Sequence, residues 1–475
     1  DLRTGDSELE GPQHITLFTV HAFGAGSSLL KDAAKNGGFI DINGNSLPDL
    51  NQEWDSNHDG IPETFYEVGD ASRLGEILLQ VAADIMNRSA TESGITIVPN
   101  PLDHESSLFQ ASYKPYLSPE GTDVNWIGFL HALWIDGFGN IREDSDGDKS
   151  LVYERDKIIR FTFDEERGET RAGILSDTDG DGIADQDAPE ALLPLDAISP
   201  LWEAGGNLVL RDAETRKIKT FVDLDGDGVA GPGEFVDFSP ENALELRPYL
   251  RAEDEAEATD IIEFVRGKMI SHFRDRSREV DGLERTWKLG DIVHSSPAFS
   301  KHPLENYHVL YGDMTYEAFF HHWRERPLTV IAGANDGMIH AFNGGTYKHG
   351  DNPLTAGVVE QGWYDLDHMS SPRTGIGDER WAYIPYNLLP HLKWLTRRDY
   401  THVYYVDCKV KVTDVRIFTG SSGNPIDSDH PHGWGTVLIG GTGFGGGNMV
   451  FADDFGSGKE ERSFSPSYFA LDITT

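Results

Sequence analysis

The sequence contains a single cysteine, Cys408, among its 475 residues. An intrachain disulfide needs two cysteines and a four-cysteine zinc site needs four, so neither stabilises this chain. The CxxCH motif that attaches c-type haem is absent for the same reason. The lone thiol does not identify the cellular compartment, because it shows only that disulfides do not hold this chain together.

Basic residues and long apolar runs are also scarce. The chain has 40 Lys and Arg against 80 Asp and Glu, a formal charge of −40. Binding of nucleic acid depends on clustered Lys and Arg, so we expect no nucleic-acid partner. No apolar run approaches the roughly 18 residues of a membrane helix, so we expect no transmembrane segment in this chain. The first residue is Asp1, which predicts a processed or trimmed N-terminus and leaves export open.

The first hundred residues have the pattern of an α/β domain. Residues 15–23, ITLFTVHAF, are a short apolar run typical of a buried strand. Ser27 or Ser28 can cap a following helix that Gly37 and Gly38 end. Apolar residues recur at helical spacing over 70–90, which predicts a second helix. Strand, helix, loop and helix fit the closing part of an α/β domain.

From about residue 105 the sequence has the texture of an all-β domain, with short aromatic and β-branched segments between Gly or Asp turns. One helix is predicted near 259–273, and 328–344 read as two strands joined by the turn Asn335-Asp336-Gly337. The prediction is a mainly β chain with an α/β N-terminal piece and a propeller or sandwich. The segments predicted as strands include 108–117, 125–136, 157–164, 206–213 and 216–223.

The stretch DLDGDGVAGPGEF, residues 223–235, matches a calcium-binding loop. Such a loop supplies oxygen ligands from positions 1, 3, 5, 7 and 12 and has glycine at position 6. Gly228 is at position 6 here. The predicted ligands are Asp223, Asp225, Asp227, the Val229 carbonyl and Glu234.

Four further acidic loops have the same spacing without a glutamate at position 12, so they predict calcium loops without EF-hand helices. Their candidate ligands are Asp177, Asp179, Asp181, Ile183 and Asp185; Asp55, Asn57, Asp59, Ile61 and Glu63; Asp144, Asp146 and Asp148; and Asp41, Asn43, Asn45 and Asp49. The alternative is a set of ordinary acidic surface turns, because Asp and Gly favour turns. Mg²⁺ fits less well than Ca²⁺, because it prefers fewer protein ligands and strict octahedral geometry. The ions are expected to be structural, since the loops interrupt β segments.

An ordered series of motifs resembles a known family. KLGDIVHSSPAF (288–299) precedes LTVIAGANDGMIHAFNGG (328–345), ERWAYIPYNLLPHLKWL (379–395) and HVYYVDCKVKVTDV (402–415), and GWGTVLIGGTGFGGG (433–447) and YFALDIT (468–474) follow. The series resembles the PilC/PilY family of type IV pilus tip-associated adhesins and biogenesis factors. NWIGFLHALWIDGFGNIRED (125–144), LWEAGGNLVLRD (201–212) and LFTVHAFGAGSSLLKDAAKNGG (17–38) extend it over almost the whole chain.

The resemblance implies that residues 1–100 are the C-terminal part of a von Willebrand type A-like domain, with acidic loops at 41–67. It implies that residues 101–475 are an incomplete β-propeller-like domain with inserted calcium loops at 144–156, 177–190 and 223–234. It further implies export to the cell surface, a place at the pilus tip, minor pilins as partners, adhesion to a host or abiotic surface, and calcium-dependent control of pilus extension and retraction. The DxSxS adhesion motif is absent and YFALDITT stands where further blades would follow, so we expect both ends to be cut.

Two other functions compete with a non-enzymatic pilus protein. A structural subunit of an extracellular filament or surface layer would also suit strong acidity and several calcium loops. A quinoprotein-like propeller enzyme would combine blades with calcium, but many such enzymes use adjacent cysteines beside the cofactor, and this chain has one cysteine. No catalytic residue is predicted.

Overall fold

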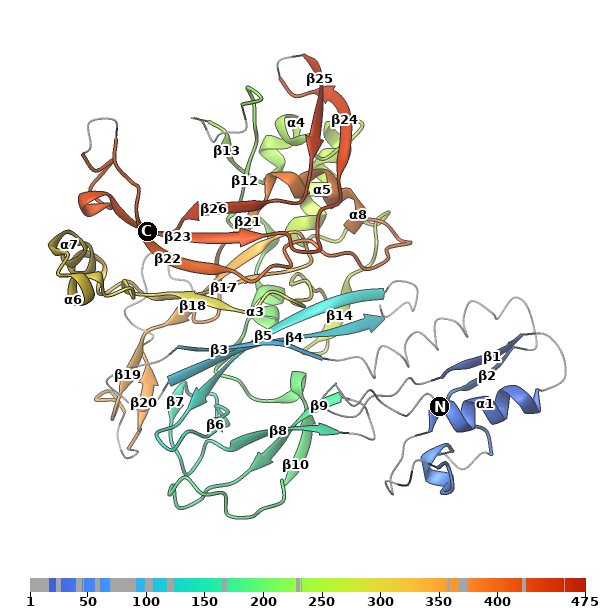
Figure 1. Ribbon diagram of the computed structural model, residues 1–475. Coiled ribbons are helices and arrows are strands. Elements are labelled where there is room, and N and C mark those ends of the chain that lie inside the picture. The colour runs from blue at the N-terminus through green and yellow to red at the C-terminus, as the bar shows by residue number, and fades with distance from the viewer. Residues whose placement is uncertain are drawn as a thin grey trace. The chain divides into compact units, whose positions relative to one another are not determined.

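The fold was analysed in a computed structural model of the chain (Figure 1). It describes residues 17–22, 27–39, 45, 47–55, 60–68, 91–98, 106–117, 124–164, 169–227, 231, 233–355, 357, 359–365, 375–420, 424–456 and 458–475. The chain divides into two compact units. The first comprises Asp1–Ala90 with Pro115–Leu117 and Thr162–Arg171, and the second comprises the rest of the chain.

The first unit contains a strand–helix–strand element. Strand β1 (Thr19–Ala22) pairs in parallel with β2 (Phe65–Val68), and helix α1 (Ser28–Gly38) and the 3-10 turn η1 (Asn51–Glu53) lie between them in the sequence. The Ser27 hydroxyl accepts a hydrogen bond from the Leu30 amide at 3.3 Å, which caps α1. The predicted strand and the predicted capped helix are therefore confirmed. The helix predicted for 70–90 lies outside the described residues.

Two large sheets lie mainly in the second unit, although the ends of β4, β8 and β9 belong to the first unit. The first sheet has the strand order β10-β9-β8-β6-β5-β4-β3, with β11 also paired to β5. Its strands are β3 (Thr91–Val98), β4 (Ser106–Leu117), β5 (Val124–Ile135), β6 (Ile141–Arg142), β8 (Ile158–Asp164), β9 (Glu169–Leu175), β10 (Ala191–Pro194) and β11 (Trp202–Glu203). Both faces of strand β5 are buried. Leu130 and Trp134 join one apolar cluster, and Leu133 joins another on the opposite face.

The second large sheet has the order β13-β12-β21-β18-β17-β16. Its strands are β12 (Ile218–Phe221), β13 (Phe235–Asp237), β16 (Ala298–Ser300), β17 (Leu328–Gly333), β18 (Ile339–Gly345) and β21 (Glu379–Ile384). Strands β17 and β18 pair antiparallel across Asn335-Asp336-Gly337, which confirms the predicted hairpin. Strand β12 runs parallel to β21, so segments far apart in the sequence meet there.

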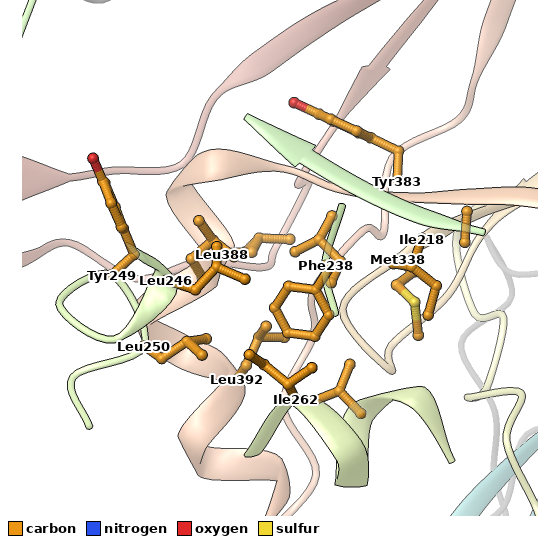
Figure 2. Packing of buried hydrophobic residues seen from close by; sticks show 14 of the residues in the cluster. Ile218, Phe238, Leu246, Tyr249, Leu250, Ile262, Met338, Tyr383, Leu388 and Leu392 are labelled. Atoms are coloured by element: carbon orange, nitrogen blue, oxygen red, sulfur yellow. The ribbon is translucent and has the colours of Figure 1, made fainter. Parts of the chain in front are cut away.

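Helix α5 (Glu255–Arg266) packs beside this sheet in the largest apolar cluster. Figure 2 shows Phe238 and Ile262 close to Leu392 within that cluster. Phe238, Ile262 and Leu392 are all fully buried. Full burial of one such side chain contributes about 1.5–3 kcal/mol, so α5, the sheet and the segment after β21 are held together mainly by apolar packing.

The remaining elements are short. The strands are β7 (Ser150–Leu151), β14 (Ser277–Val280), β15 (Leu283–Thr286), β19 (Tyr347–His349), β20 (Gly362–Tyr364), β22 (Lys411–Arg416), β23 (Trp434–Gly441), β24 (Met449–Asp454), β25 (Lys459–Phe464) and β26 (Tyr468–Asp472). The helices and 3-10 turns are η3 (Leu195–Ala197), α3 (Ala204–Leu210), η4 (Ala213–Thr215), η5 (Pro240–Asn242), α4 (Ala243–Leu246), α6 (Tyr307–Tyr311), α7 (Met314–Trp323), η6 (Tyr386–His391), α8 (Leu392–Leu395) and η7 (Pro431–Gly433).

The described residues are mainly β, as predicted, but their sheets keep open edges and no closed barrel or ring of blades is detected among them. In the same part of the chain, no helix combines the length and apolar character needed to cross a membrane.

One local prediction was wrong, and a second was confirmed with different bounds. Residues 206–213 were predicted as a strand but contribute to helix α3. The Glu203 carboxylate caps that helix by accepting hydrogen bonds from the amides of Gly205 and Gly206 at 2.7 and 2.5 Å. The helix predicted for 259–273 spans Glu255–Arg266, because Asp254 caps its start and Gly267 ends it in the left-handed conformation.

A buried charge network crosses the second large sheet. The Arg216 guanidinium makes two hydrogen bonds with Glu379, at 2.8 and 2.9 Å. The two His340 ring nitrogens contact Glu379 Oε1 at 2.8 Å and Asp336 Oδ2 at 3.0 Å. Burial opposes a charge on His340, but Asp336 and Glu379 outweigh it and raise the pKa of His340 to about 9. Burial likewise opposes ionisation of Glu379, but Arg216 and His340 hold the pKa of Glu379 well below its usual range.

The His340 charge makes stability depend on pH. Because the folded-state pKa is about 9 and the ordinary value is 6.5, its contribution is complete below pH 6.5 and is lost as pH rises through about 9. We expect the free energy of unfolding of the wild-type protein to fall over this window and that of His340→Asn to fall less. Urea titrations of both proteins at several pH values measure the difference. Parallel curves for the two proteins would contradict the assignment.

Candidate metal centres

Three carboxylates meet at the base of the loop 223–234. Asp223 follows strand β12 and Glu234 precedes β13, its antiparallel partner. The Val222 amide donates to the Glu234 carbonyl at 2.8 Å, which closes the loop. One carboxylate oxygen each from Asp223, Asp225 and Glu234 lies within 4.8 Å of the others. Asp223 and Glu234 are buried, whereas Asp225 is exposed, so the group has a sheltered floor and an open side.

Backbone amides orient these carboxylates. Glu234 accepts from the Leu224 amide at 2.8 Å and from the Gly231 amide at 2.5 Å, and Asp223 accepts from the Gly226 amide at 2.8 Å. Such bonds fix the direction in which a carboxylate points. Asp227 is described but does not belong to the group of three, and Val229 lies outside the described residues.

A distant strand reaches the same loop. The Arg462 guanidinium, from β25, donates to the Asp223 carbonyl, and the Tyr249 hydroxyl donates to that carbonyl at 2.8 Å. Arg462 also pairs with Glu460. The loop is therefore connected by its first residue to the β24–β25 hairpin.

In the second loop, Asp177, Asp179 and Asp185 form the group of three. Asp177 is buried and contacts the Arg142 guanidinium at 2.5 Å, while Arg142 also contacts Asp136 at 2.6 Å. Asp185 accepts hydrogen bonds from the Thr178 amide and hydroxyl.

Asp181 does not join the group of three, and the Ile183 carbonyl stays a predicted ligand, because the group comprises carboxylates alone. Asp181 accepts from the Ile183 amide at 2.8 Å, so its carboxylate turns toward its own backbone, and Ile183 itself is 69% exposed.

The third group contains a residue that sequence spacing missed. Asp144 and Asp146 come together with Asp156, whereas Asp148 pairs with Arg155 at 3.2 Å. The missed signal is a carboxylate at the far end of the loop, at position 13 counted from Asp144, one residue later than Glu234 in the loop 223–234. Despite two backbone amide donors, burial first and then the neighbouring carboxylates raise the pKa of Asp156 to about 7.

Two positively charged side chains lie next to this third group. Lys149 Nζ lies 2.9 Å from Asp144, and Arg155 Nη1 lies 2.5 Å from Asp146. Burial raises the pKa of Asp144 in spite of Lys149. The carboxylates here are thus only partly balanced by side chains.

The two loops of the first unit are described only in part. Asp55 is buried and accepts a hydrogen bond from the Gly60 amide at 3.0 Å. Ile61 and Glu63 are also among the described residues, and they stay predicted ligands. Asn45 donates from its side chain to Asp49 at 2.8 Å. The other predicted ligands lie outside the described residues, namely Asn57, Asp59, Asp41 and Asn43.

The chemistry of the three groups fits a hard divalent cation. Ca²⁺ takes six to eight oxygen ligands at about 2.3–2.6 Å, mainly carboxylates and carbonyls. Each group offers carboxylate oxygens from residues separated along one loop, so an ion bound there would fix the loop and offset the repulsion between carboxylates. Acidic groups of this kind also occur without an ion. The arrangement suits binding, and it has the oxygen-only donor set of a structural site.

The chain is similar to curated pilus proteins. A type IV pilus biogenesis factor PilY1 homolog of Xylella fastidiosa is 29% identical over 194 residues, which are 39% of this chain and 12% of that protein. Another from the same organism is 32% identical over 178 residues, 35% of this chain and 9% of that protein. The type IV pilus biogenesis factor PilY1 of Pseudomonas aeruginosa strain UCBPP-PA14 is 25% identical over 319 residues, 63% of this chain and 21% of that protein.

These matches support a relationship to the PilY1 family, in agreement with the motif series. The aligned segments span between 9 and 21% of the length of these three relatives. No family model matches the chain, and no solved structure matches it.

Removal of the predicted ligands of the 223–234 loop should reduce the stabilisation of the protein by calcium. An ion at 100 times its dissociation constant stabilises a folded protein by about 2.7 kcal/mol. We expect Asp223→Ala with Glu234→Ala to reduce the rise in melting temperature that calcium produces, relative to EGTA. The matched control is Asp237→Asn, an exposed carboxylate on β13 that pairs with Lys219. An equal response of the double variant and the wild type would contradict this site.

Arg142 offers a test of the second loop. Because Arg142 is fully buried between Asp136 and Asp177, Arg142→Met should lower the free energy of unfolding by about 3–5 kcal/mol. If Asp177 ligates calcium, added calcium should restore part of this loss. Denaturant unfolding with calcium and with EGTA measures both effects, and a loss of the same size in both buffers would exclude Asp177 as a ligand.

Proposed function

We propose that this chain is part of a non-enzymatic, calcium-binding protein of the type IV pilus that acts at the pilus tip in adhesion and in the control of pilus assembly and retraction. The observation that carries the proposal is the similarity to proteins named type IV pilus biogenesis factor PilY1, at 25–32% identity. Those names describe biogenesis factors rather than enzymes, which supports a binding function.

The carboxylate groups support the calcium part of the proposal. Three loops each gather three carboxylates within 4.8 Å, and two of these groups include a residue from the far end of the loop. A cation there stabilises a loop that the chain alone leaves with an excess of negative charge. The contact from Arg462 to the Asp223 carbonyl links the 223–234 loop to the β24–β25 hairpin. Binding of calcium would therefore also restrict the hairpin. The calcium concentration would in this way affect the conformation of the surface that the hairpin forms.

The domain assignment is part of the same proposal. Residues 1–100 would be the closing part of a von Willebrand type A-like domain, and the parallel β1–β2 pair with α1 between them in sequence supports an α/β domain. Residues 101–475 would be part of a propeller-like domain, supported by sheets that are mostly antiparallel.

The partners and location follow from the relatives rather than from the geometry. The proposal places the protein outside the cell at the pilus tip, exported and associated with the outer membrane, with minor pilins as partners and a host or abiotic surface as target. A formal charge of −40 suits a protein that works among divalent cations rather than nucleic acids.

The test is genetic and is done in the source organism. We expect an epitope-tagged full-length protein to co-purify with pili sheared from the cells, and deletion of its gene to reduce surface piliation. Complementation with Asp223→Ala, Glu234→Ala should restore the protein level without the normal response of piliation to calcium. The control is complementation with Asp237→Asn.

Unchanged piliation after deletion, with no tagged protein in the sheared fraction, would overturn the proposal. A regular surface array that contains many copies of the protein would favour a filament or surface-layer subunit. A quinone absorbance band in the purified native protein would favour an enzyme.

A further inference from the structure

A cavity of about 670 Å³ lies in the second unit beside the glycine-rich segment GGTGFGGG, residues 440–447. Ligand pockets usually have volumes of about 300–1,000 Å³. The cavity is lined by that segment, by the chain from η6 through α8, and by residues 402–405. The carboxylate groups described above use none of these residues.

The glycine-rich segment is shaped to present one aromatic ring. Phe444 is 76% exposed, and its ring centroid lies 5.9 Å from that of Tyr404. A side chain at Gly445 would overlap the Tyr405 carbonyl, so only glycine permits this close approach. Gly446 has φ of +68° and also lines the cavity. The glycines therefore let the segment pack closely against Tyr405 while Phe444 stays exposed beside the cavity.

Part of the cavity wall, called here the apolar floor, consists of apolar side chains. Phe273, Pro390, Val403 and Met449 contribute to it. An apolar wall leaves the hydroxyl groups of a bound sugar without hydrogen-bond partners, which costs binding free energy. A ligand with a large apolar group fits this surface better than an oligosaccharide.

The lining includes three cations, Arg251, Lys393 and Arg397, and one carboxylate, Glu257, although the whole chain has a formal charge of −40. Lys393 pairs with Glu257 at 2.5 Å, and Arg397 pairs with Asp399 at 2.6 Å. Arg251 makes no ion pair with any described residue, and its guanidinium lies 5.8 Å from the Phe451 ring centroid. Arg251 is thus available to an anionic group at the mouth.

We propose that this cavity binds an acidic peptide segment of a partner protein that inserts a large apolar side chain between Phe444 and the apolar floor and places a carboxylate at Arg251. Aromatic and arginine side chains carry much of the free energy of protein–protein binding, and Trp394, Tyr404 and Arg397 line the same cavity. The proposal rests on the cavity alone and does not depend on a role in the pilus.

The experiment uses the purified chain and the fluorescein-labelled peptide Gly-Glu-Glu-Phe-Glu-Glu-Gly with blocked ends, followed by fluorescence anisotropy. We expect saturable binding that weakens when Phe is replaced by Ala in the peptide, and that is absent when Glu is replaced by Lys. Arg251→Glu and Phe444→Ala should each weaken binding about tenfold, the loss expected when one well-placed interaction is removed.

Two matched variants serve as controls. Arg324→Glu reverses another exposed arginine, and Tyr311→Ala removes an aromatic side chain that is 78% exposed on α6. Neither residue lines the cavity. Both variants should bind the peptide as the wild type does, and the melting temperatures of all four variants should match that of the wild type.

Failure of the acidic peptide to bind with saturation would overturn the proposal, as would an equal loss of binding in the controls. Laurate and an oligosaccharide of glucuronic acid are tested in parallel. If either binds in a manner that depends on Arg251 and the peptide does not, the cavity is a site for a fatty acid or an acidic sugar instead.

Discussion

The fold depends on placing positive charge next to its carboxylates, because the chain has twice as many acidic as basic residues. Buried or crowded carboxylates raise the free energy of the folded state unless a cation lies beside them. Two buried arginines meet this requirement, and a third contacts an acidic loop through a backbone carbonyl. Arg216 faces Glu379 in the core of a sheet, Arg142 lies between Asp136 and Asp177, and Arg462 reaches the first residue of the 223–234 loop.

Each of these arginines also joins segments that are distant in the sequence. Arg216 precedes β12 and Glu379 begins β21, so their ion pair holds the parallel strands together. Arg462 comes from β25 and fixes a carbonyl more than two hundred residues earlier in the chain. The Arg216–Glu379 contact therefore both neutralises charge and positions the sheet, whereas Arg462 pairs with Glu460 and positions the loop by a separate contact with a carbonyl.

The arginines balance only part of the charge in the acidic loops. Arg142 faces two carboxylates, and Asp179 and Asp185 add two more next to Asp177. At the 144–156 loop, the raised pKa of Asp156 reflects burial among other acids. In the proposal, an oxygen-preferring divalent cation would supply the missing positive charge through oxygen ligands alone. This connects the charge balance within the fold to the proposed dependence on calcium.

The sequence by itself determined the features that depend on neighbouring residues. Alternating acids at 223–227, the cap at Ser27 and the turn at Asn335-Asp336-Gly337 are local, because spacing along the chain fixes which atoms can meet. Only the tertiary structure decided that Asp156 joins Asp144, that Arg142 and Arg462 reach the acidic loops, and that 206–213 form part of a helix capped by Glu203. Those outcomes depend on which strands pair and which side chains are buried together, and apolar packing between segments far apart in the chain sets both.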